Sequence, residues 1–263
     1  MKASIVTILT LILGTVLYGQ NQIVKDSIHF DKKIIDYSID TNGAIFLSFE
    51  GGEITKYSAD LDSLFSYSPS KVGNTNLIEP GNGLIIFAFY EFFQEYLLTN
   101  RFLAQPTRTR FSNSAIDYID LATQSLDNNI WLVENAGFRL IKFNTALKVI
   151  EVETALNTVI ENKDNNFTFI KEYQNQLFLV DEKSGIYVFD NLGNFSKFIP
   201  AITNKCTFEN NNIIYLEKNE LVIVDIYSTK KERTILKNKD IIGVMKHKNN
   251  TFYVHPTYLF RVH

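Results

Sequence analysis

The chain has 263 residues, with 26 Lys and Arg against 29 Asp and Glu, and its formal net charge at pH 7 is −3. This mild acidity argues against general nucleic-acid binding, which needs a basic surface. The single cysteine, Cys206, excludes an intramolecular disulfide. The length is sufficient for one or two domains with a substantial core.

The first residues have the pattern of a secretory signal peptide. Lys2 precedes an apolar run from Ile5 to Val16, and small or neutral residues follow up to Gly19. The run is too short to span a bilayer. We therefore expect residues 1–19 to be cleaved near Gly19, leaving residues 20–263 as a single periplasmic domain. The alternative is an uncleaved N-terminal anchor.

Six turn-plus-strand units follow in chain order. They read TNGAIFLSF, GNGLIIFAF, DNNIWLVEN, QNQLFLVDE, NNNIIYLEK and KNNTFYVHP, and their central residues are 37 to 47 positions apart. Asn or Gly ahead of an alternating strand is typical of a hairpin. The spacing is that of a four-stranded propeller blade. The units are anchored, in chain order, on Phe46, Ile86, Trp131, Phe178, Tyr215 and Phe252.

The remaining strands of each unit follow the same pattern. Innermost strands are expected at IIDYSI (34–39), AIDYIDL (115–121), FTFIKEY (167–173) and IIGVMKH (241–247). The last unit ends after its third strand, and a surplus strand, DSIHF (26–30), precedes the first unit. Pairing these two ends would close a ring and leave no long exposed edge. We predict an all-β, six-bladed propeller of four-stranded blades, closed by the N-terminal strand. The alternatives are seven blades, with a degenerate blade in residues 99–115, and two packed β-sandwiches.

The sequence shows no catalytic or cofactor motif. The four histidines lack metal-binding spacing, and no nucleophile elbow or phosphate-binding glycine loop is present. We therefore expect a non-catalytic protein with no metal and no cofactor. The second hypothesis is a metal-dependent, lactonase-like hydrolase or a small-ligand binder that uses the central channel. It would need inner-strand polar residues such as Asp36, Glu79, Asp117 and Glu172. A third, carbohydrate binding, would use Trp131, which is more typical of a core position.

One acidic residue leaves the second strand in five units: Glu50, Glu91, Glu134, Asp181 and Glu217. Carboxylates on one rim could bind a divalent cation or a basic partner. The simpler interpretation is that they cap hairpin backbone and keep the tips soluble. A separate basic surface is expected on the fifth blade, from Lys230, Lys231, Arg233, Lys237 and Lys239. It is either an ordinary solvated face or a contact for an acidic partner.

The second hairpin differs from the others because its tip is aromatic. Corresponding tips read EGGE, ENAG and EKNE, whereas this one reads EFFQE. Exposed aromatic and arginine side chains are typical binding anchors. We predict a partner-binding site formed by Phe92, Phe93, Arg101, Arg108 and Arg110. The alternative is that the long segment after Leu98 folds over the two phenylalanines.

In these repeats the chain resembles periplasmic β-propellers along its whole mature length. It lacks the GH and WD pairs of WD40 repeats and the double glycine of kelch repeats. In size, compartment and composition it is similar to the plug propeller of the type 9 secretion translocon. That resemblance implies a protein partner, an outer-membrane barrel whose periplasmic end the propeller would close.

Overall fold

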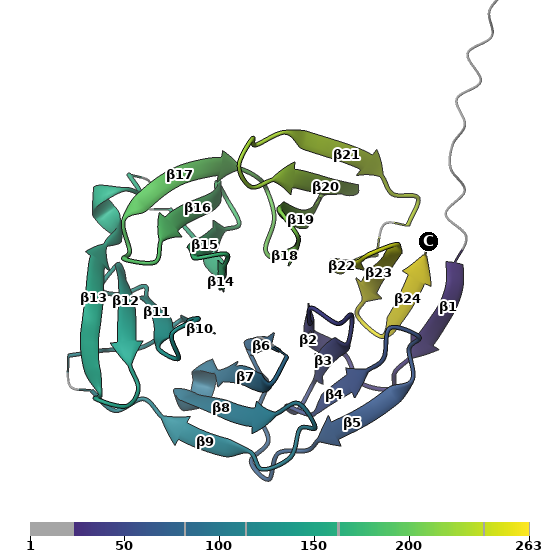
Figure 1. Cartoon of the computed structure of the whole chain (residues 1–263), viewed down its shortest axis with the longest axis horizontal. Helices are drawn as coiled ribbons and strands as arrows, with labels where there is room; N and C mark the ends of the chain where they lie inside the picture. The colour runs from purple at the N-terminus through teal and green to yellow at the C-terminus, as the bar shows by residue number, and fades with distance from the viewer. Residues whose placement is uncertain (1–23, 82, 114, 162–163, 239, 263) are drawn as a thin grey trace, which may run out of the picture.

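Six four-stranded antiparallel sheets are arranged around a ring in the computed structural model of the chain (Figure 1). The structure describes residues 24–81, 83–113, 115–161, 164–238 and 240–262. The predicted signal peptide, residues 1–19, lies outside these residues. Six blades confirm the predicted all-β propeller and rule out both alternatives, a seventh blade and paired sandwiches, within the described ranges.

The first three blades follow one another in chain order. Blade 1 contains β2 (Ile34–Ile39), β3 (Ile45–Phe49), β4 (Ile54–Tyr57) and β5 (Ser63–Tyr67). Blade 2 contains β6 (Leu77–Glu79), β7 (Ile85–Tyr90), β8 (Glu95–Asn100) and β9 (Thr107–Arg110). Blade 3 contains β10 (Leu121–Gln124), β11 (Ile130–Glu134), β12 (Arg139–Asn144) and β13 (Val149–Ala155). Two short 3-10 helices, η1 (Glu91–Phe93) and η2 (Leu156–Thr158), follow β7 and β13.

The other three blades complete the ring. Blade 4 contains β14 (Phe167–Tyr173), β15 (Gln176–Asp181), β16 (Gly185–Asp190) and β17 (Phe195–Pro200). Blade 5 contains β18 (Cys206–Glu209), β19 (Asn212–Glu217), β20 (Glu220–Asp225) and β21 (Lys231–Ile235). Blade 6 contains β22 (Gly243–His247), β23 (Asn250–His255), β24 (Tyr258–Val262) and, outermost, β1 (Val24–His29).

The ring closes as predicted, through the N-terminal strand. β1 pairs antiparallel with β24, from Val24 opposite Val262 to His29 opposite Tyr258. The guanidinium of Arg261 reinforces this closure with ion pairs to Asp26 on β1 and Asp60 on blade 1. The first and last strands are thereby joined to each other and to the neighbouring blade.

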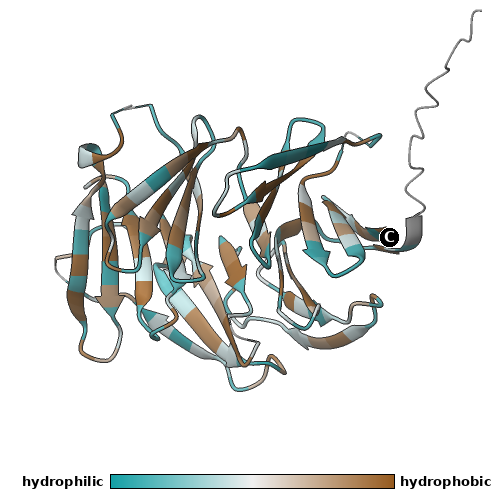
Figure 2. Cartoon of the chain, turned by 45° about the horizontal axis from the view of Figure 1, so that its top comes forward, coloured by the Kyte–Doolittle hydropathy of each residue, from teal (hydrophilic) through white to brown (hydrophobic). Residues whose placement is uncertain are grey.

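The core lies between the blades, on both faces of each sheet. All six predicted anchor residues fall in second strands, and none is more than 1% exposed. A strand that packs against blades on both sides reads as a continuous apolar run. β3 and β11 are buried at every position. Figure 2 shows apolar colour along many of the strands and hydrophilic colour in many turns.

The innermost strand of blade 3 was predicted at the wrong place. It is β10, Leu121–Gln124, and residues 115–120 form the connection before it. The side-chain amide of Gln94 donates a hydrogen bond to the carbonyl of Ile119 and accepts one from its N–H. The carboxylate of Glu134 accepts the N–H of Asp117. Because these groups bond to side chains, most of the connection does not pair with β11.

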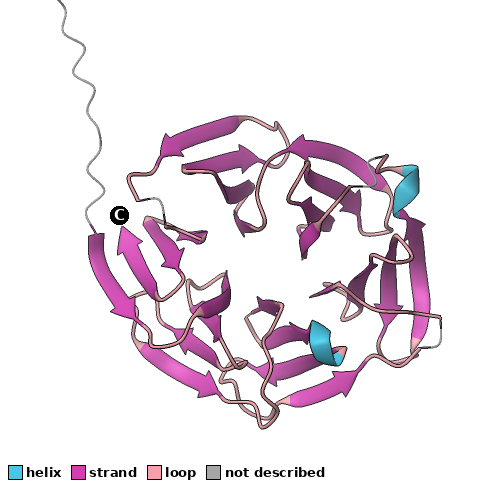
Figure 3. Cartoon of the chain, turned by 180° about the vertical axis from the view of Figure 1, so that it is seen from behind, coloured by secondary structure: helices cyan, strands magenta, loops and turns pink. Residues whose placement is uncertain are grey.

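The two faces of the ring carry different loops. One face, called here the hairpin face, carries the turns that join first to second and third to fourth strands. The opposite connection face carries the second-to-third-strand hairpins and the blade-to-blade connections. Figure 3, seen from behind, shows η1 and η2 on the connection face. No helix in the described ranges is long and apolar enough to cross a bilayer.

Candidate functional site

The predicted aromatic tip lies on the connection face, in the hairpin between β7 and β8. Phe92 is 84% exposed there, the largest value among the described large apolar side chains. Gln94 ends η1 in the left-handed region, with φ 52°. Its amide nitrogen donates to the carbonyls of Glu91 and Ile119, at 2.7 and 2.9 Å, which ties the hairpin to the next connection.

Phe93, unlike Phe92, is covered from several sides. The Nζ of Lys71 lies 3.7 Å from its ring centroid, and the guanidinium carbon of Arg108 lies 5.5 Å from it. Gly73 passes beneath the ring so closely that a Cβ there would lie 2.4 Å from it. Phe92 packs edge-on against Phe93, with 5.2 Å between the ring centroids. The exposed ring therefore stands on a fixed one.

Arg108 joins this aromatic pair to the interior of blade 2. Its guanidinium stacks over Tyr90 at 4.2 Å, and its Nη2 lies 3.1 Å from a carboxylate oxygen of Glu95. Glu95 also pairs with Lys71, at 3.3 Å. Burial raises the pKa of Tyr90 well above its usual range. The stack of Tyr90, Arg108, Phe93 and Lys71 supports Phe92 from below.

The structure separates the five predicted site residues. Phe92, Phe93 and Arg108 lie together. Arg110 is the last residue of β9, is exposed, and lies opposite Glu95, the first residue of β8 after the aromatic tip. Arg101 does not join them, because it follows β8 and lies on the hairpin face. The alternative prediction is that the segment after Leu98 folds over the two phenylalanines. It is correct for Phe93, which Arg108 of that segment contacts, and wrong for Phe92, which is exposed.

Sequence reasoning missed one residue beside this tip. Val72 is 75% exposed and lies in the connection from blade 1, next to the glycine that packs on Phe93. The polar context SPSKVGNTN does not indicate that Val72 lies beside the aromatic tip. The name aromatic ridge is used below for Val72, Phe92 and Phe93 with the cations Lys71 and Arg108.

The acidic residues after the second strands act mainly as backbone caps. Glu134, Asp181 and Glu217 each accept an N–H from the connection that enters their own blade. The guanidinium of Arg139, bonded to Glu134, holds the pKa of that carboxyl below its usual value. Glu91 accepts from the amide of Asn76 and the hydroxyl of Tyr118. Capping of hairpin backbone is confirmed for Asp181, which also accepts the N–H of Lys183. Glu134 and Glu217 cap the backbone of a connection instead, and Glu91 accepts from side chains.

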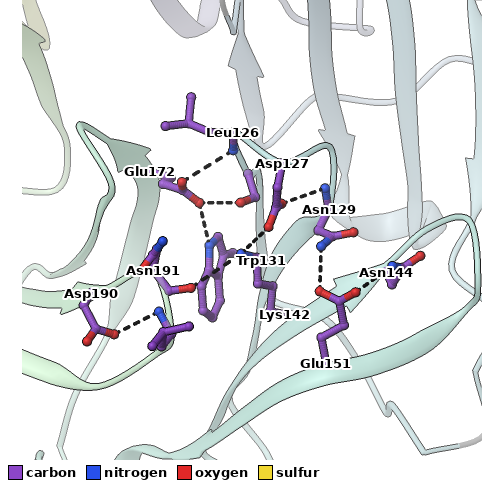
Figure 4. Close-up of polar contacts among 12 residues, drawn as sticks. Leu126, Asp127, Asn129, Trp131, Lys142, Asn144, Glu151, Glu172, Asp190 and Asn191 are labelled. Atoms are coloured by element: carbon purple, nitrogen blue, oxygen red, sulfur yellow. Dashed lines mark hydrogen bonds and ion pairs between the residues drawn. The ribbon is translucent and has the colours of Figure 1, made fainter.

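The channel-lining carboxylates are likewise occupied. Glu172 on β14 accepts the indole N–H of Trp131 at 2.7 Å and the hydroxyl of Ser125 at 2.6 Å (Figure 4). Trp131 is fully buried between blades 3 and 4, so it is a core residue. Lys142 contacts Asp127 at 2.5 Å and lies over the indole at 5.3 Å. This network fixes two blades to each other.

Two further carboxylates make ion pairs that cross the ring. Asp36 pairs with Lys205 of blade 5, and Glu79 pairs with Lys171 of blade 4 at 3.0 Å. Asp117, the other residue considered for the channel, lies in the connection before β10 and not on an inner strand. In the part of the chain that the structure describes, no three His, Cys, Asp or Glu residues are grouped as metal ligands.

The basic surface of blade 5 is largely paired with groups of blade 5 and of the neighbouring blade 4. Arg233 contacts Glu217 and Glu220, each at 2.5 Å, and Lys231 donates to the carbonyl of Pro200. Lys239 lies outside the described residues. This arrangement favours the ordinary solvated face.

No known protein family matches the sequence, and no curated protein does. Several solved structures match in shape. The Cps50 (Swd1) β-propeller domain of Myceliophteria thermophila has a TM-score of 0.67 and 7% identity, covering 92% of this chain and 99% of that one. Virginiamycin B lyase from Staphylococcus aureus has a TM-score of 0.64 and 10% identity, covering 90% and 98%. The Pan2 WD40 domain of Neurospora crassa has 0.57 and 9%, covering 85% and 73%.

The chain has the β-propeller fold. At these identities the likeness shows the fold alone, and the neighbours include both a lyase and WD40 domains. Propellers of both kinds, enzymes and protein-binding modules, are therefore compatible with this architecture.

Proposed function

We propose that this protein is a non-catalytic, periplasmic propeller that binds another protein through its aromatic ridge. The observation that carries the proposal is Phe92, an 84% exposed aromatic ring at a hairpin tip whose base is fixed. An apolar residue this exposed lowers solubility unless it is covered, and aromatic anchors dominate many interfaces.

The ridge is prepared for binding before a partner arrives. Phe93 is held between Lys71, Arg108 and the Gly73 backbone. Gln94 fixes the hairpin to the neighbouring connection. Little side-chain or loop entropy remains to be lost on association, so more of the contact energy contributes to affinity.

For the partner, we propose an outer-membrane secretion barrel, whose periplasmic end the propeller would cap. A closed ring of six blades is a rigid disc, and the ridge lies on one of its broad faces. The resemblance to the type 9 plug in size, compartment and composition, together with the expected export signal, supports this choice. The two cations of the ridge, Lys71 and Arg108, would complement an acidic periplasmic rim of the barrel.

The test is affinity purification of the tagged protein from gently solubilised native envelopes. Phe92→Ala should reduce recovery of the barrel at least about tenfold, as expected for an anchor residue. Leu147→Ala is the matched control, because Leu147 is 71% exposed but follows β12 on the hairpin face. Cell fractionation of the same strain tests the periplasmic location.

Each result bears on a different part of the proposal. Loss of the barrel with Phe92→Ala, but not with Leu147→Ala, supports both the site and the partner. Recovery of the barrel at wild-type level with Phe92→Ala overturns the site. Ridge-dependent recovery of a different protein overturns the barrel, and recovery of no protein by the wild type overturns the binding function.

A further inference from the structure

The centre of the ring holds a cavity that the proposed function does not use. It has a volume of about 590 Å³ and opens on the hairpin face, opposite the aromatic ridge. All six blades contribute to its wall. This volume lies within the range of pockets that enclose a drug-sized molecule.

Cross-ring ion pairs form the deep part of the cavity. Lys171 reaches Glu79 at 3.0 Å, and the other carboxylate oxygen of Glu79 accepts the Thr123 hydroxyl at 2.6 Å. Lys205, paired with Asp36, lies 5.1 Å from the ring centroid of Phe169. The two ion pairs connect blades that are not neighbours in the ring.

The acidic and basic groups of the wall differ in accessibility. Four carboxylates line the cavity: Asp40, Glu79, Glu172 and Glu209. The first three are buried, and all four already accept hydrogen bonds from the protein. Four lysines also line it: Lys171, Lys205, Lys246 and Lys248. None of them is buried.

Lys246 is the half-buried cavity lysine whose ammonium group has no protein partner among the described residues; Lys248 is exposed and bonds to Glu209 through its backbone N–H. Lys246 is the fourth residue of β22 and is half-buried in the cavity wall. Within the described ranges its Nζ makes no hydrogen bond or ion pair. Lys171 has one ion-pair partner for its three N–H donors. The cavity therefore offers charged donors without protein partners, while each of its four carboxylates already accepts at least one hydrogen bond.

Aromatic rings form another part of the wall. Tyr173 and Phe208 are stacked with 4.7 Å between ring centroids, and both line the cavity together with Phe169. The Tyr173 hydroxyl donates to the carbonyl of Asn210, which orients the ring. A flat apolar group can pack against such a surface.

We infer that the central cavity binds a small organic anion, a carboxylate or sulfonate on a flat apolar body. The ammonium groups of Lys246 and Lys171 take the charge, and the wall of Phe169, Tyr173 and Phe208 takes the apolar part. Charged hydrogen bonds in a partly enclosed site are stronger than those on an open surface. This inference is independent of the aromatic ridge.

A pair of fluorescent probes tests both halves of the inference. The anion 8-anilinonaphthalene-1-sulfonate and the neutral N-phenyl-1-naphthylamine differ only in the sulfonate group. We expect the anion to bind the full chain with one-to-one stoichiometry. In Lys246→Met its affinity should fall about five- to tenfold, the effect of one partly exposed charged contact, while the affinity of the neutral probe stays unchanged.

Two control variants distinguish the cavity from the rest of the surface. Lys33→Met removes the same charge from an exposed lysine outside the cavity, and Phe92→Ala removes the exposed ring of the ridge. Neither should change either affinity. Absence of saturable binding of the anion overturns the inference. So does an equal loss in Lys246→Met and Lys33→Met, or a loss of the neutral probe equal to that of the anion.

Discussion

Replacing Arg261 should weaken the closure of the ring by a defined amount. Its side chain is 5% exposed, and it bonds to Asp26, to Asp60 and to the carbonyl of Ala59. Both carboxylates keep access to water, at 47% and 79% exposure, so neither is left as a buried charge when the arginine is removed. Each contact then contributes about 1 kcal/mol after solvent screening.

The net cost for Arg261→Met is smaller than the sum of these contacts. The buried Nε–H of Arg261 has no partner among the described residues, and methionine removes that cost while keeping an apolar stem. We therefore expect a loss of about 2 kcal/mol in the free energy of unfolding. For a domain of this size the melting temperature should fall by about 4–8 °C.

Thermal and urea unfolding followed by circular dichroism measure this loss. Arg101→Met, at an exposed turn, is the control and should change stability by less than about 0.5 kcal/mol. Hydrogen exchange gives a local readout, because amides of β1 and β24 should exchange faster while those of β15 do not. Equal stability of the two variants, or faster exchange in every blade, would refute the reasoning.

Three further predictions concern buried groups elsewhere in the ring. Burial raises the pKa of Cys206 to about 12, so a thiol reagent at pH 8 should label it only after denaturation, and rapid native labelling would contradict the packing of β18. Burial also raises the pKa of Tyr215 to about 12 and that of Tyr37 further. The unfolded chain ionises first at all three groups, so the free energy of unfolding measured in urea should begin to decrease above about pH 8.5, where the unfolded Cys206 thiol ionises, and should decrease more steeply above about pH 10. Asp181→Ala removes a buried cap of three donors and should cost about 2–3 kcal/mol in urea unfolding, whereas Glu50→Ala, exposed at the equivalent position, should cost less than about 0.5.

Local patterns were sufficient to predict the blades. The Asn or Gly turn before each anchor specifies a hairpin, and the alternation after it specifies a buried strand, as at Phe178 and Trp131. The same method misplaced the inner strand of blade 3. Alternation in AIDYIDL resembles a strand, but Gln94 and Glu134, from other parts of the chain, bond to its backbone.

Contacts across the ring could not be predicted from the sequence. Lys205 and Asp36 are 169 residues apart, and they meet only because the ring brings blades 5 and 1 together. The exposure of Phe92 was predictable, since its hairpin tip differs from the others. The support beneath it was not, because Lys71 and Gly73 come from a connection with an ordinary polar sequence.

The pairing of β1 with β24 has a consequence for the order in which the chain folds. Asp26 is among the first described residues to leave the ribosome, and its partner Arg261, 235 residues later, is among the last. Five blades can form from contiguous segments during synthesis, while the sixth has to wait for both ends. Such a long-range contact is slow to form. Until it forms, β1 is unpaired and β24, which pairs with β23 on one side, has an open outer edge. Both can pair with other chains, which makes the final step the one most exposed to aggregation.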